Sequence, residues 1–431
     1  DADDRWVCVR AIPFSCVDPP GRRTLIAMSS TAMKSEPEQG VLLLFALGHL
    51  GNDWAVGAIY LIAPAMALSF GLGPAEVGLL ITIYGIGAAL AYMPAGVVAD
   101  RSSRRGGLLL ATFVWVAVGH VIASYAPDYW TFALLMAIAV MGDAAWHPIA
   151  TGYLVQRFPG RRARVLGIHA MGGTIGAEVL APLGVGAVLT FADWRTALQI
   201  ASLPAALVGL VFLFNLRRIA LVPVVAPQSL DFVGLIRPWC RGQGLRLAVM
   251  MVFYNMAGIA IISMFPLYLQ TELEYGPLTV SFLFAGMLFA GSLLQPWLGG
   301  ISDRHGRRAL IVAGLLVASA SALLAGLLQA GPGAIGAVMV AGALFTGIRS
   351  IVLAAAVEVA SKRQSATLAL AFTVLDGVGA AGALFAGLAA QQALAYAFLL
   401  AGGFGLIATA LGALLKAKSS EAITTATESE N

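Results

Sequence analysis

Residues 96–105, GVVADRSSRR, return 203 positions later as residues 299–308, GGISDRHGRR. Both copies place a glycine, an aspartate followed by an arginine, and a closing pair of arginines at the same spacing. Each copy also follows the second long apolar segment of its half of the chain. Because residue type, spacing and position all agree, the sequence predicts an internal duplication.

The composition around these motifs excludes an ordinary soluble protein. Hydrophobic residues make up 59% of the 431 residues and charged residues only 11%, whereas a soluble domain carries roughly 25% charged residues. A helix needs ~20 apolar residues to cross ~30 Å of hydrocarbon. The segments that meet this requirement are residues 41–68, 76–99, 107–125, 131–156, 165–191, 196–214, 247–270, 278–301, 309–330, 334–360, 365–390 and 393–415. The sequence therefore predicts an all-α membrane protein with twelve transmembrane helices.

The connections between these segments divide them into two groups of six. We expect residues 1–40 to be a disordered extension, 41–214 and 247–416 to be six-helix bundles, 215–246 to be their linker, and 417–431 to be a tail. Of the 26 Lys and Arg residues, 24 flank one face of the predicted bundle and Arg195 alone flanks the other. The positive-inside rule then predicts that both termini and the linker are cytoplasmic.

With these motifs in place, the sequence resembles the major facilitator superfamily. The loop signature of that family, between its second and third helices, is written G-x-x-x-D-R-x-G-R-R. The matching residues are Gly96, Asp100, Arg101, Arg104 and Arg105 in the first copy, and Gly299, Asp303, Arg304, Arg307 and Arg308 in the second. The resemblance implies two pseudo-symmetric bundles around a central cavity that opens alternately to either side. We expect the motif residues to act in gating, by stabilising the interface between the two halves on the cytoplasmic side.

A narrower resemblance is to the fosmidomycin-resistance branch of bacterial efflux proteins. It is carried by Gly48-His49-x-x-Asn52-Asp53 in the first span and by His147-Pro148 in the fourth. Gly172-Gly173-x-x-Gly176 with Pro182 in the fifth span adds to it. The branch has a glutamate after His-Pro, where Ile149 stands here, so a role for that carboxylate is absent.

Several charged residues lie well inside the predicted spans, where each costs ~2.5–3.5 kcal/mol at the centre of a helix. They are Asp53, Asp143, Glu178, Arg349 and Asp376. Such residues must be paired, protonated or exposed to a water-filled cavity, and their default interpretation is functional.

Two of these acids have a histidine one helical turn away. His49 precedes Asp53 by four residues, and His147 follows Asp143 by four, so each pair shares a helix face. With Asn52, they are candidates for proton coupling or substrate binding. The alternative is that they only brace the first and fourth spans by hydrogen bonds.

The remaining candidates leave their roles open. His169 and Glu178 are nine residues apart on the fifth span and face nearly opposite directions, so both cannot point into one cavity. Arg349 could bind an anionic group or neutralise Asp376 or Glu178. Asp376 lies in the middle of the eleventh span and is also a candidate for binding or coupling.

The favoured function is a secondary transporter of the bacterial inner membrane that exports a small organic molecule or drug in exchange for protons. The chain has no nucleotide-binding motif, and we expect no enzymatic activity, no cofactor and no resident metal. The expected partners are the transported molecule, protons and the lipid bilayer, without nucleic acid, and the chain is expected to be a monomer. The alternatives are proton-coupled uptake of an organic anion, divalent-metal transport through His and Asp ligands, and a receptor or scaffold that transports nothing.

Overall fold

A computed structural model describes residues 38–158, 160–217, 219, 234, 236–359 and 369–416. Residues 1–37 of the expected extension, half of the expected linker at 215–246 and all of the expected tail at 417–431 therefore lie outside the described residues. The secondary structure of the described residues is helical throughout. Twelve of their helices are long and apolar enough to cross a membrane, which confirms the predicted fold class.

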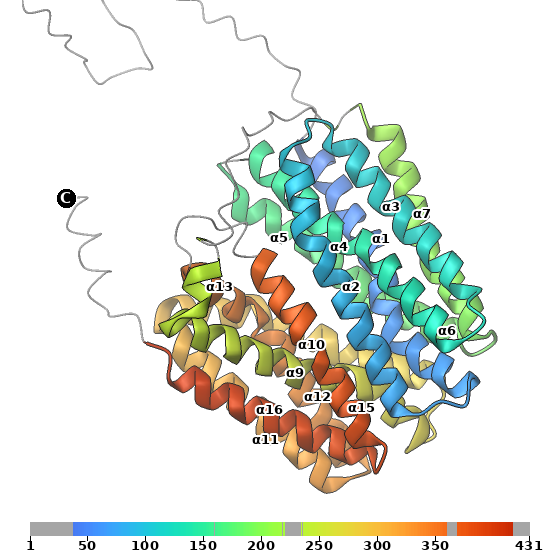
Figure 1. Ribbon diagram of the computed structural model, residues 1–431, viewed down its shortest axis with the longest axis vertical. Helices are drawn as coiled ribbons and strands as arrows, with labels where there is room; N and C mark the ends of the chain where they lie inside the picture. The colour runs from blue at the N-terminus through green and yellow to red at the C-terminus, as the bar shows by residue number, and fades with distance from the viewer. Residues whose placement is uncertain are drawn as a thin grey trace, which may run out of the picture. The chain divides into compact units, whose positions relative to one another are not determined.

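The helices follow one another in two groups, coloured blue to green and yellow to red in Figure 1. The first group is α1 (Glu38–Ser69), α2 (Pro74–Asp100), α3 (Arg105–Ser124), α4 (Tyr129–Arg157), α5 (Arg162–Gly173), the π-helical η1 (Thr174–Leu180), α6 (Ala181–Val188) and α7 (Trp194–Asn215). The second is the 3₁₀ turn η2 (Arg237–Cys240), α9 (Gly242–Thr271), α10 (Pro277–His305), α11 (Arg307–Leu328), α12 (Pro332–Gly347), α13 (Arg349–Val359), the π-helical η3 (Thr373–Val378), α15 (Ala381–Ala390) and α16 (Leu394–Ala413). Each predicted span overlaps one of the twelve membrane-length helices.

Three spans are less regular than the sequence predicts. In the fifth span the first α-helix ends at Gly173, and the π-helical η1 separates it from the second, α6. The eleventh span contains η3 at the corresponding place in the second half. The tenth span is interrupted at Ile348, directly before Arg349. π-Helical turns are rare and occur frequently at functional sites, so these segments are candidates for part of such a site.

Prolines inside the helices repeat between the halves. Pro64 in α1 and Pro266 in α9 are 202 residues apart, and so are Pro94 in α2 and Pro296 in α10. Membrane helices tolerate such prolines because neighbouring groups satisfy the freed backbone carbonyls. The duplication therefore extends beyond the two loop motifs to the distortion of the helices themselves.

The two halves meet at the end of the helices opposite the motif loops. We call the end at Asp100 the motif end. At the opposite end α2 lies beside α15 (Figure 1), and α6 contacts α10. The first pair packs closely because glycines remove the side chains: a Cβ on Gly78 would collide with the carbonyl of Ala383, and one on Gly387 with the carbonyl of Pro74. The same region carries buried apolar residues from both halves, so the core continues across the junction.

An aspartate caps the helix that follows one of the turns. The side chain of Asp193 accepts a hydrogen bond of 2.8 Å from the backbone N–H of Thr196 in the first turn of α7. The bonds from the Thr196 backbone and hydroxyl hold the pKa of the Asp193 carboxyl below its usual range. Stability from a group with a lowered pKa is present above its unfolded pKa and is lost as the pH falls.

Replacing this cap gives a pH-dependent stability prediction. Asp193→Ala is expected to lower the free energy of unfolding by about 1 kcal/mol at pH 7. The difference from wild type is expected to shrink below about pH 4, because the carboxylate is then protonated in the unfolded chain and increasingly in the folded one. Asp193→Asn is the control, since asparagine caps a helix without a charge. Thermal unfolding of the three proteins in detergent at pH 7 and pH 3 measures this, and an Asp193→Ala deficit that is the same at both pH values contradicts the assignment.

Candidate functional site

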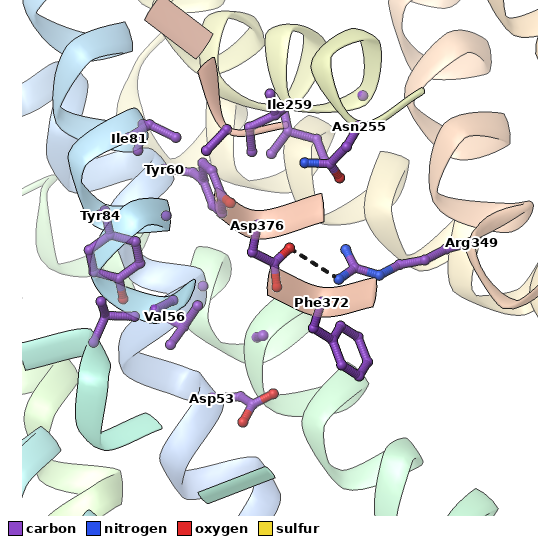
Figure 2. A pocket seen from close by; sticks show the side chains of 18 of the residues that line it. Asp53, Val56, Tyr60, Ile81, Tyr84, Asn255, Ile259, Arg349, Phe372 and Asp376 are labelled. Atoms are coloured by element: carbon purple, nitrogen blue, oxygen red, sulfur yellow. Dashed lines mark hydrogen bonds and ion pairs between the residues drawn. The ribbon is translucent and has the colours of Figure 1, made fainter. Parts of the chain in front are cut away.

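A cavity of ≈340 Å³ lies between the two halves and is lined by both of them. Pockets for small organic ligands begin at about this size. Its polar and aromatic lining comprises Asp53, Tyr60, Tyr84, Tyr92, Asp143, His147, Glu178, Tyr254, Asn255, Phe345, Thr346, Arg349, Phe372 and Asp376. Figure 2 shows part of this lining, with Asp53 and Tyr84 on one side and Arg349 and Phe372 on the other.

The two predicted acid–histidine pairs are brought together on this cavity. Nε2 of His49 lies 3.1 Å from Oδ2 of Asp53, and Nε2 of His147 lies 3.5 Å from Oδ2 of Asp143. The rings of His49 and His147 are 5.1 Å apart. Nδ2 of Asn52 donates a 2.6 Å hydrogen bond to Oδ1 of Asp143 and ties α1 to α4. One cluster of two carboxylates and two imidazoles results, with Asp143 only 4% exposed.

Backbone contacts fix the orientation of His49. Its Nδ1 lies 2.8 Å from the carbonyl oxygen of His169, and a carbonyl can only accept, so Nδ1 carries a proton. In the neutral ring, Nε2 therefore presents its lone pair toward Asp53. Gly173 leaves room for this ring, because a Cβ there would approach it to 2.6 Å. The glycines of the fifth span thus let α5 pack against the imidazole.

His169 lies behind the cavity. Its ring stacks on His49 with 4.1 Å between centroids, and its Nδ1 donates to the carbonyl of Phe45 over 3.2 Å. Glu178, the other candidate on this span, does line the cavity. The two side chains point in different directions, as their spacing predicts. Glu178 faces the cavity, and His169 packs between α1 and α5.

Each π-helical segment carries one carboxylate that is hydrogen-bonded to the other half of the molecule. The hydroxyl of Ser292 in α10 donates to Glu178 of η1. The hydroxyl of Tyr92 in α2 donates to Oδ2 of Asp376 in η3 over 2.8 Å. The two halves are therefore joined at the cavity by a matched pair of bonds.

Arg349 forms the ion pair that was one of its two expected roles. Its Nη2 lies 3.5 Å from Oδ1 of Asp376 (Figure 2). The guanidinium also lies over the ring of Phe372, 6.0 Å from its centroid. The positive charge is thus already compensated in the structure.

Tyrosines are the cavity residues that the sequence analysis missed. Tyr60, Tyr84 and Tyr254 each lie well inside a membrane-length helix. Tyrosine in membrane proteins usually lies at the lipid–water interface. A tyrosine in the middle of a span was therefore the signal that could have found them.

The motif residues lie at the ends of α2 and α10, away from the contact between the halves. Arg105 is 1% exposed, donates to the carbonyl of Ala99 over 3.2 Å and lies 3.7 Å from Asp100. Arg307 lies 3.6 Å from Asp303 and donates to Glu358 over 3.0 Å. These bonds stay within one half. The expected role of the motif residues at an interface between the halves stays a prediction, because the halves meet at the opposite end in this conformation. The other motif residues belong to the same two loops and helix ends; they are Gly96, Arg101, Arg104, Gly299, Arg304 and Arg308.

One part of the cluster has donors spaced closely enough for a cation. A ligand atom from each of His49, Asp53 and His147 lies within 4.8 Å of the other two. Imidazole and carboxylate donors suit divalent transition metals. Of the described residues, this group is the one that could hold such an ion.

Comparison with known proteins shows the family of the chain. The sequence profile of the Major Facilitator Superfamily matches residues 45–240 and 247–431. A "Probable sugar efflux transporter" of Helicobacter acinonychis is 31% identical over 34% of this chain and 37% of its own length. A "Probable 4-methylmuconolactone transporter" of Cupriavidus pinatubonensis is 25% identical over 58% of this chain and 60% of its own length. The chain thus matches between about a third and three-fifths of the length of these relatives.

Solved structures share the fold at low sequence identity. A bacterial homologue of the human lysosomal transporter Spinster, in an inward-facing and unoccupied conformation, has a TM-score of 0.74 and 18% identity, over 88% of this chain and 97% of its own. A nucleoside transporter has a TM-score of 0.71 and 16% identity, over 87% of this chain and 100% of its own.

Proposed function

Because the chain belongs to the Major Facilitator Superfamily, we propose that it exports a small organic molecule across the bacterial inner membrane in exchange for protons. The observation that carries this proposal is the cluster of Asp53, Asp143, His49 and His147, in which both acids and His147 line the central cavity and His49 contacts Asp53 from behind. Two acids and two imidazoles so close together can share a proton among them. Such a unit can hold a proton in one access state and release it in the other.

The conformation supports an inward-open assignment. The halves meet at the end opposite the motif loops, and the positive-inside rule assigns the motif end to the cytoplasm. The similar Spinster homologue is also described as inward-facing. In this proposal the molecule enters the cavity from the cytoplasm and leaves after the halves rock about it. The motif loops then close the cytoplasmic end in the outward-open state.

The direction of transport rests on two supports. The names of several relatives describe efflux transporters. Arg349 is paired with Asp376, so its positive charge does not require an anionic substrate as a partner. This pairing argues against uptake of an organic anion. Energy would come from the proton gradient, with the inward movement of protons driving the outward movement of the molecule.

Reconstituted flux tests the proposed function. A thermal-stability screen of small organic compounds on the purified chain first identifies a compound that raises its melting temperature. The radiolabelled compound is then added to proteoliposomes that contain the chain, under an imposed pH gradient, and its uptake is measured with and without a protonophore. We expect accumulation on the acidic side that collapses with the protonophore. Accumulation that ignores the pH gradient contradicts proton coupling, and the absence of any flux of a bound compound favours a receptor.

Divalent-metal transport is the second candidate function. It is favoured by the close approach of His49, Asp53 and His147, and by the His169 carbonyl, which holds the Nδ1 proton of His49 so that Nε2 is the nitrogen that faces Asp53 and could bind a metal once deprotonated. Histidine ligands of metals typically donate their other ring N–H to such a carbonyl. Calorimetric titration of the purified chain with Zn²⁺ and Mn²⁺, followed by flux of any ion that binds, separates this function from organic export.

A further inference from the structure

The carboxylates on the cavity differ in how their charges are compensated. Asp376 pairs with Arg349, and each acid of the N-terminal cluster has its own histidine. Glu178 has neither. Among the residues that the structure describes, no Lys, Arg or His forms an ion pair with it, and its bond is to the uncharged hydroxyl of Ser292. Among the described residues, Glu178 is therefore the carboxylate of the cavity with no basic group at ion-pair distance, although Arg349 lies in the same cavity.

The pseudo-symmetry of the halves makes this difference clear. Glu178 and Asp376 occupy the π-helical segments of the fifth helix in each half, and each is bonded to the opposite half. The fourth helix of the second half supplies Arg349 to its carboxylate. The fourth helix of the first half, α4, has one arginine, Arg157, in its last turn at the motif end. Among the described residues of the first half, no cation stands where Arg349 stands in the second.

A second, independent feature of the wall points to a ligand. Tyr84 lines the cavity and is 5% exposed, yet its hydroxyl has no hydrogen-bond partner among the described residues. Buried hydroxyls are normally paired. Tyr60 and Phe372 bring further aromatic rings to the same cavity, as Figure 2 shows. Aromatic faces attract cations through the quadrupole of the ring.

These observations identify the chemistry of a ligand. We propose that the transported molecule is an organic monocation, an amine or quaternary ammonium on a flat apolar body, whose charge is bound by Glu178. The inference rests on the proposed export function and adds the class of substrate. A cation beside Glu178 compensates the unpaired carboxylate in a site of low dielectric, which an anion or a neutral molecule does not. The apolar body packs against the aromatic rings, and a polar group on it can bond to Tyr84.

Three probes of similar shape and different charge test the proposal. They are N-methyl-4-phenylpyridinium, 4-phenylpyridine at pH 8, where it is neutral, and biphenyl-4-carboxylate. Their equilibrium binding to the full chain in lipid nanodiscs is measured by competition against the radiolabelled cation. We expect the cation to bind at least about 30-fold more tightly than either other probe, the effect of one desolvated charge pair. Equal binding of the neutral probe, preference for the anion, or no binding of any probe at millimolar concentration overturns the proposal.

Variants locate the charge. Glu178→Gln is expected to weaken binding of the cation by about 30-fold or more and to leave the neutral probe unchanged. Glu178→Asp keeps the charge and is expected to retain most of the preference. Glu272→Gln is the matched control, since it makes the same substitution on an exposed carboxylate at the end of α9. An unchanged preference for the cation in Glu178→Gln contradicts the assignment, and the charge preference of the wild type tests the substrate class even where a variant does not fold.

Flux of the same probes separates this inference from the proposed function. One outcome is that an imposed pH gradient drives flux of the neutral or anionic probe while the cation does not bind. That result leaves proton-coupled export standing and removes the organic-cation inference. Binding of the cation through Glu178 without any gradient-driven flux leaves the cation site standing and removes proton-coupled export.

Discussion

Asp53→Asn and Asp143→Asn are expected to reduce transport driven by a pH gradient to background, while exchange of substrate between the two sides continues without a gradient. The physical reason is that asparagine keeps the shape of the side chain and removes the site that binds and releases the proton. Exchange needs no net movement of protons, so it survives. Radiolabelled uptake with an imposed gradient, and counterflow without one, are measured on the same proteoliposomes.

The competing interpretation is that the cluster only holds α1 against α4. The 2.6 Å bond from Asn52 to Asp143 gives that interpretation a concrete basis. It predicts that the two variants lose thermal stability and exchange together, and that any folded protein remaining keeps its dependence on the gradient. Asp128→Asn, which changes a helix-capping carboxylate outside the cavity, is the control. Full gradient-driven uptake in Asp143→Asn refutes the role of the cluster in coupling.

Gly78→Val is expected to move the chain out of the conformation described here. A branched side chain at Gly78 would collide with the backbone of Ala383, so the contact between α2 and α15 cannot close. Overpacking of such a contact costs about 1–3 kcal/mol, which shifts the population of a two-state transporter by roughly 5- to 150-fold. The end opposite the motif loops should therefore open.

Chemical labelling measures this shift. A cysteine at Ile81, which lines the cavity, is introduced into a chain without other cysteines. It is expected to react with an impermeant maleimide from the side opposite the motif loops much faster in Gly78→Val than in the parent. Gly403→Val in α16 is the control, because a Cβ there meets open space. Equal labelling rates in the two valine variants contradict the proposed contact between the halves.

The helices themselves could be predicted from the sequence, because twelve apolar runs of membrane length and two loop motifs leave little choice. The π-helical segments could not. A π turn uses the same residue types as the α-helix around it, so its sequence does not distinguish it. The break of the tenth span at Ile348 directly follows Gly347, and one glycine among the many in these spans is too common a signal to predict it.

The site was predictable where it depended on spacing within one helix. His49 with Asp53, and Asp143 with His147, share a face by their four-residue spacing, and the fold brings the two faces together. The partner of Arg349 was not predictable, since Asp376 and Glu178 were both available on other helices. The nine-residue spacing of His169 and Glu178 excluded that both face one cavity, but it could not decide which one does. The structure places Glu178 on the cavity, and the ring of His169 stacks on that of His49 in helix packing.

Proton movement into the lumen is the measurement that tests proton-coupled export most directly. Proteoliposomes containing a trapped pH-sensitive dye, held at zero membrane potential with K⁺ and valinomycin, receive a transported compound on one side without an imposed pH gradient. Exchange of the compound for protons predicts a change in lumenal pH that follows the flux of the compound and is absent in Asp53→Asn. Flux of the compound in the wild type with no change in lumenal pH contradicts proton coupling through this cluster.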